Sequence, residues 1–149
     1  MDTKQVGKCD YYDCSVGGGT MASPTSKQVL DNNALPPQPP GATRFVVVSD
    51  THEYHHRFVL PKGDVLVHCG DILLSDVFCP RWVSWLRAKA FFKWVESQKH
   101  IPHKIVIGGN HDGVLERYGA AEVRKIAGPT TDYLEDDTVS ILGYTIYGT

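Results

Sequence analysis

The sequence predicts an α/β fold built on a parallel sheet, and three observations lead to this class. Three short runs of mainly β-branched residues, at 45–48, 64–68 and 104–107, are typical of strands buried on both faces. A helical pattern at 80–99 lies between the second and third runs, as expected for a right-handed crossover between parallel strands. Each run ends at side chains able to bind metal, so the three strand ends are the candidate site.

The segment 80–99 is expected to form a helix that packs in the core. Its apolar stripe is Trp82, Trp85, Leu86, Phe92 and Val95. Four charged residues are expected to face water, namely Arg81, Lys93, Glu96 and Lys99. The aromatic residues could instead line a ligand site, but core packing is the favoured interpretation.

The last third of the chain predicts a second helical segment and then short strands. Residues 114–126 have helical character, and Gly128-Pro129 is a stop signal. Beyond it, 133–134, 138–142 and 144–147 alternate in the period of a strand, with Gly143 between the last two. We expect a hairpin or strand pair there.

Residues 1–43 are predicted to be a disordered arm, and residues 44–149 the folded α/β domain. The arm contains Gly17-Gly18-Gly19 and a proline-rich linker at 36–41, and few branched apolar residues that could form a core. The four cysteines do not form a dense disulfide or zinc pattern, so free thiols are favoured.

Charge and hydropathy indicate which partners the chain lacks. A formal net charge of −2 and a pI near 6.4 give no reason to expect nucleic acid. No apolar stretch approaches the roughly 20 residues that span a bilayer, and the first residues lack a signal-peptide core. The expectation is a cytoplasmic protein without a membrane partner, and a small anionic substrate would need local positive charge such as bound metal.

Five residues at the strand ends carry the predicted chemistry: Asp50, His52, Asp71, Asn110 and His111. Any one of them alone would more often be a turn or capping residue. Three such strand ends in order, with crossover spacing, favour a shared site. Mixed oxygen and imidazole ligands suit manganese, iron or zinc, and two such ions can hold and hydrolyse a phosphoester.

The same residues resemble the first three sequence blocks of the calcineurin-like metallophosphoesterase superfamily, and in particular its metallophosphoesterase-domain-containing class. The blocks are Asp50-x-His52, Gly70-Asp71 and Gly109-Asn110-His111-Asp112. The resemblance implies a layered β-sandwich with flanking helices. It also implies that Asp50 and His52 bind the first metal ion, Asp71 bridges two ions and Asn110 binds the second.

By the same resemblance, His111 is the catalytic residue that acts on the phosphate oxygens or the leaving group. The implied reaction is hydrolysis of phosphodiesters such as cyclic nucleotides by a two-metal-activated water. Five other histidines match no block and are expected to be structural or on the surface: His55, His56, His68, His100 and His103.

The later histidine blocks of the family have no counterpart here, since no histidine follows His111. The second ion would then have only Asp71 and Asn110 from this chain. Residues 44–149 are accordingly expected to be a partial calcineurin-like phosphoesterase domain, truncated after its first βαβαβ portion. Three accounts stay open: a truncated product of a full enzyme, a non-catalytic metal- or partner-binding form, or half of a site completed by another chain. Loss of the later strands would leave an apolar face of the sheet exposed to aggregation unless a protein partner covers it.

Overall fold

The computed structural model describes residues 9–10, 29–30, 35–74 and 79–149. The predicted disordered arm lies largely outside these residues, and its disorder stays a prediction. Within it, β1 (Cys9–Asp10) and β2 (Val29–Leu30) form a short antiparallel pair. Among the described residues, no helix is long and apolar enough to cross a membrane.

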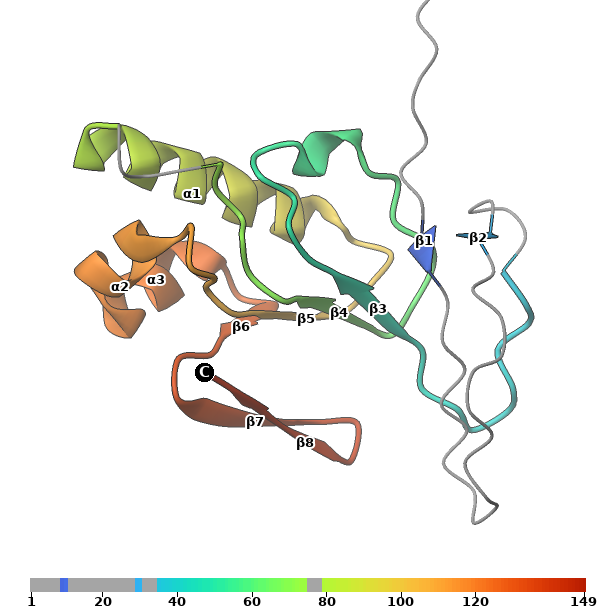
Figure 1. Ribbon diagram of the computed structural model, residues 1–149. Helices are drawn as coiled ribbons and strands as arrows, with labels where there is room; N and C mark the ends of the chain where they lie inside the picture. The colour runs from blue at the N-terminus through green and yellow to red at the C-terminus, as the bar shows by residue number, and fades with distance from the viewer. Residues whose placement is uncertain (1–8, 11–28, 31–34, 75–78) are drawn as a thin grey trace, which may run out of the picture.

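A four-stranded parallel sheet forms the centre of the fold, as the sequence predicts (Figure 1). Its strands lie in the order β3 (Phe45–Val48), β4 (Val65–His68), β5 (His103–Val106) and β6 (Thr131–Tyr133). The fourth strand differs from expectation, because residues near 133 were grouped with the later strands and instead pair with β5. All four strands therefore end at the same edge of the sheet.

Three helices cover one face of this sheet: α1 (Arg81–Ser97), α2 (Gly113–Tyr118) and α3 (Ala120–Ala127) (Figure 1). The predicted helix at 114–126 is divided in two at Gly119, whose φ of 81° is outside the helical region. Trp85 of α1 stacks on Tyr118 of α2, with ring centroids 4.0 Å apart.

The predicted buried face of α1 is partly wrong. Trp82 and Leu86 are 65% and 54% exposed. The buried residues are Ser84, Ala88, Phe91, Phe92 and Val95. Two of these buried residues, Ser84 and Ala88, are small, and the larger Trp82 and Leu86 are turned outward.

A hairpin of β7 (Asp137–Ile141) and β8 (Tyr144–Gly148) lies on the opposite side of the sheet from the helices (Figure 1). It confirms the strand pair expected around Gly143. Alternate residues of the central strands face the two layers: Leu66 packs with the helices, whereas Val65 packs with Ile141 of the hairpin. The arrangement is a layered α/β fold with a core on each side of the sheet.

Candidate metal centre

The loops after β3 and β4 are joined by backbone hydrogen bonds, which brings two of the predicted blocks together. The Asp50 amide donates to the Gly70 carbonyl (3.1 Å), and the His52 amide donates to the Asp71 carbonyl (3.0 Å). Gly70 also lies so close to Gly109 that an added Cβ would come within 2.8 Å of the Gly109 backbone. The third block, after β5, therefore packs directly against the second.

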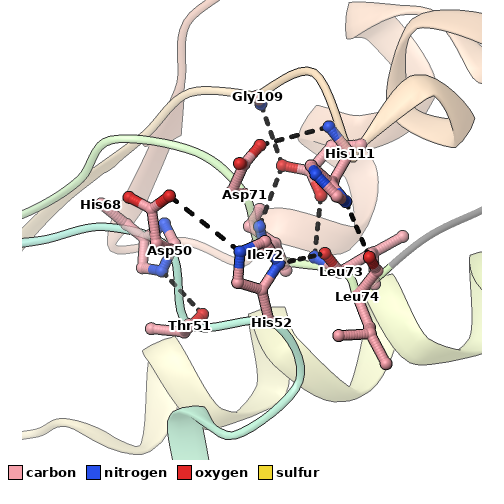
Figure 2. A network of polar contacts seen from close by, with 11 residues as sticks. Asp50, Thr51, His52, His68, Asp71, Ile72, Leu73, Leu74, Gly109 and His111 are labelled. Atoms are coloured by element: carbon pink, nitrogen blue, oxygen red, sulfur yellow. Dashed lines mark hydrogen bonds and ion pairs between the residues drawn. The ribbon is translucent and has the colours of Figure 1, made fainter.

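Asp50, His52 and Asp71 form a compact group of potential metal ligands. One ligand atom from each lies within 4.8 Å of the others, and His52 Nε2 is 4.0 Å from Asp50 Oδ1 (Figure 2). Asp50 is exposed, while His52 and Asp71 are half-buried. In the described part of the chain, neither carboxylate forms an ion pair with Lys or Arg, so their negative charge is available to a cation.

A backbone carbonyl sets the orientation of the His52 imidazole. Its Nδ1 lies 2.9 Å from the Leu73 carbonyl oxygen, which can only accept, so Nδ1 carries the proton and donates (Figure 2). Nε2, on the Asp50 side, is then left with its lone pair. A metal-binding histidine usually donates its other ring N–H to an acceptor in this way.

His111 lies against the same group from the third block. Its amide donates to Asp71 Oδ1 (3.2 Å), and its Nδ1 donates to the Leu74 carbonyl (2.7 Å). The His111 and His52 rings are 4.9 Å apart, edge to face. The structure therefore brings four of the five predicted residues together.

Asn110, the fifth predicted residue, lies exposed in the turn between Gly109 and His111. Its position beside His111 places it at the same edge of the sheet. Its role as a ligand of a second metal ion stays a prediction.

Asp112 is a residue of the site to which the sequence assigned no role beyond its place in the third block. Its buried carboxylate accepts from the backbone amides of Ile72 (3.0 Å), Leu73 (2.8 Å) and Gly109 (2.9 Å). Burial raises the pKa of Asp112, and the three amide donors oppose that rise. Asp112 therefore links the second block to the third, and it holds in place Leu73, whose carbonyl orients His52.

The backbone at the centre adopts conformations that L-residues rarely take. Asp50, His52, Glu53 and Asp71 have φ angles of 55°, 42°, 68° and 54°. Such left-handed conformations cost roughly 1–2 kcal/mol each for non-glycine residues. Their concentration on one pair of loops indicates a functional site whose geometry is maintained by the surrounding structure.

A second layer of polar contacts supports these loops. Glu53 accepts from Arg87 Nη1 of α1 (2.9 Å), which anchors the first loop to the helix layer. Thr51, between the two ligands of the first block, is hydrogen-bonded to buried His68 (3.0 Å). His68 is thus one of the structural histidines expected from sequence.

The donor set fits a divalent cation. Two carboxylates and an imidazole are the ligands that manganese, iron and zinc accept. Hydrogen bonds hold the His52 ring through Nδ1 and the Asp71 carboxylate through the His111 amide, and they leave His52 Nε2 free for the cation.

The comparisons with known proteins agree with this geometry. The sequence model of the calcineurin-like phosphoesterase family matches residues 43–148. The human Metallophosphoesterase domain-containing protein 1 is 34% identical over 133 residues, which cover 75% of this chain and 38% of the human protein, and the mouse protein of that name gives the same values. A UPF0046 protein of Caenorhabditis elegans is 30% identical over 119 residues, covering 70% of this chain and 38% of its own. The chain thus spans 38% of the length of these curated relatives.

Proposed function

This chain belongs to the calcineurin-like phosphoesterase family, and from that premise we propose that it contributes a metal-binding centre for phosphoester hydrolysis. The observation that carries the proposal is the group of Asp50, His52 and Asp71, with ligand atoms within 4.8 Å of one another. When bound there, a divalent cation polarises a phosphoryl oxygen and lowers the pKa of a coordinated water.

The proposed roles of the protein groups are those that the family resemblance implies. Asp50 and His52 Nε2 would hold a first ion, Asp71 would be shared with a second ion, and Asn110 would hold the second. Asp71 suits the shared position because a carboxylate has two oxygens, of which Oδ1 also accepts the His111 amide. Manganese, iron or zinc is the proposed metal.

His111 is the proposed acid toward the substrate. The Leu74 carbonyl accepts from its Nδ1, so Nε2 is the nitrogen left to meet a phosphate oxygen or the leaving group. A protonated ring donates there, and the Leu74 carbonyl stabilises the ring while it carries charge.

The proposed substrates are phosphodiesters, with cyclic nucleotides as the specific candidate class. The two imidazoles of His52 and His111 lie at the centre, whereas Arg87 is already paired with Glu53. A diester carries a single negative charge at neutral pH, and it therefore requires less positive charge from side chains than a monoester dianion.

Hydrolysis of bis(p-nitrophenyl) phosphate with Mn²⁺ tests the proposal. Asp71→Asn removes the charge of the shared ligand and is expected to lower the rate by 100-fold or more, on the order of the loss for a group essential to metal catalysis. Asp132→Asn makes the same chemical change at an exposed position of β6 and should keep the wild-type rate. Equal rates for the two variants would refute the assignment.

A second candidate function is metal or partner binding without turnover. Metal binding without turnover is favoured because the second ion has only Asp71 and Asn110 as proposed ligands in this chain. Partner binding is favoured by Val47 of β3, which is 59% exposed on the sheet face opposite the helices. Mn²⁺ binding that depends on Asp71, with no hydrolysis by the chain alone, is the result that distinguishes this function. A protein covering the sheet would then restore hydrolysis on mixing.

A further inference from the structure

Thr51 lies between two proposed metal ligands, and its side chain is buried. It is 2% exposed, and its Oγ1 is 3.0 Å from Nε2 of His68, the last residue of β4 (Figure 2). His68 is fully buried, and its ring lies against Phe91 of α1. The first block is therefore attached to the core by a side-chain hydrogen bond directly beneath the ligands.

We propose that His68 is a positioning residue that keeps Asp50 and His52 in their metal-binding arrangement through Thr51. The inference rests on the proposed metal centre and adds to it two residues that do not touch the metal or the substrate.

The conformation of the loop explains why this attachment matters. Asp50 and His52, on either side of Thr51, both have positive φ angles. This conformation is strained, so the loop would relax to another one if the surrounding structure did not hold it. Backbone bonds to the Gly70 and Asp71 carbonyls hold the loop on the side of the second block. The Thr51 side chain holds it from the core side, so the loop cannot relax without leaving a buried hydroxyl unpaired.

His68 is suited to this role by rigidity and by charge. Its ring packs edge to face on Phe91 of α1, with centroids 4.8 Å apart. Its Nδ1 has no hydrogen-bond partner among the described residues, so Thr51 is the polar group that orients the ring. Burial, and then the charge of His55, lower the pKa of His68 to about 4, so the ring is neutral at pH 7.

Mn²⁺ affinity, measured by electron paramagnetic resonance of the free ion, tests the role of the hydroxyl. Thr51→Val preserves the shape of the side chain and removes the hydroxyl, and it is expected to weaken binding about 10- to 100-fold, as the loss of outer-shell partners does. Thr51→Ser keeps the hydroxyl and should restore affinity close to wild type. Thr131→Val is the matched control, because it also removes a poorly exposed hydroxyl. Thr131 is the first residue of β6, away from the centre, and its hydroxyl donates to Glu96 of α1.

His68→Phe and the double variant test whether both residues act through one bond. His68→Phe should weaken Mn²⁺ binding as much as Thr51→Val, and the double variant should be no weaker than either single variant. Additive losses, or a loss of the same size in Thr131→Val, would overturn the inference and indicate a general effect of lower stability.

Amide hydrogen exchange without metal separates this inference from the proposed function. Faster exchange of the His52 and Glu53 amides in Thr51→Val, but not in Thr51→Ser or Thr131→Val, is the expected result, because both amides donate to the second block. Unchanged exchange in Thr51→Val would contradict the positioning role. If the wild-type chain bound no Mn²⁺, the proposed function would fail, and hydrogen exchange alone would then decide whether His68 holds the loop.

Discussion

At the scale of single residues, the centre depends on groups that the sequence cannot distinguish from ordinary ones. The proposed ligands themselves were predictable, because Asp50, His52 and Asp71 stand at recognisable strand ends and the structure brings them together. The carbonyls of Leu73 and Leu74, which orient the two histidines, carry no sequence signal, since every residue has a carbonyl. Asp112 was visible in the third block, but its three amide donors come from a fold that brings separate loops together.

Replacement of Asp112 is predicted to cost more stability than replacement of a surface carboxylate. Asp112→Ala leaves the amides of Ile72, Leu73 and Gly109 without their acceptor, and we expect a loss of about 3 kcal/mol or more in the free energy of unfolding. Urea unfolding measures this loss. The control is Asp137→Ala, which breaks an exposed pair with Arg124 and should cost less than about 1 kcal/mol.

The burial of His68 predicts a pH dependence of stability. Burial and the charge of His55 hold its pKa at about 4, below the ordinary 6.5, so between these values the unfolded chain binds a proton that the folded chain does not. Stability is therefore expected to fall as the pH is lowered from 6.5 to 4, by up to about 3 kcal/mol.

Urea unfolding in EDTA from pH 7 to pH 4.5 checks this dependence. His68→Gln removes the titrating group and should flatten the fall, whereas His56→Gln, at an exposed histidine, should preserve it. The same slope in all three proteins would contradict the assignment to His68.

At the scale of elements, strands were predicted better than helix faces. The β-branched runs located β3, β4 and β5 within a residue or so of their ends. The three residues of β6 are too few for a periodic signal, and their pairing with β5 depends on a partner distant in sequence. The buried face of α1 was misjudged because the apolar stripe was assumed to include Trp82 and Leu86, whereas the buried residues include the small Ser84 and Ala88.

The contact between the second and third blocks predicts a strong effect at Gly70. Gly70→Ala would place a Cβ within 2.8 Å of the Gly109 backbone at a φ of 90°, so both strain and a backbone clash oppose folding. Gly143→Ala has a similar φ of 86° with nothing within 4 Å of the added carbon, and it is expected to cost only about 1–2 kcal/mol.

Thermal or urea unfolding of both variants separates the two effects. Gly143→Ala introduces backbone strain alone, whereas Gly70→Ala introduces strain and a backbone clash. We expect Gly70→Ala to lose clearly more stability than Gly143→Ala, and to lose Mn²⁺ affinity as well. Equal losses would mean that the two loops are less closely packed than the structure places them.

At the scale of the whole molecule, the layered fold gives the centre its position. The helices pack on one face of the parallel sheet and the hairpin packs on part of the other, and the strand ends at a single edge bring together proposed ligands from separate parts of the chain (Figure 1). The parallel sheet and the ordered ligand blocks were predictable from local patterns. The stacking of the layers was not, because it depends on contacts between distant residues.

The central claim is that Asp50, His52 and Asp71 together bind a divalent cation. Titration of the purified chain with Mn²⁺, followed by electron paramagnetic resonance, tests it most directly, with Asp71→Asn and the exposed Asp132→Asn compared at the same charge. The account predicts saturable binding to the wild type and to Asp132→Asn, and loss of that binding in Asp71→Asn. Equal binding by all three proteins, or no saturable binding to the wild type, would contradict it.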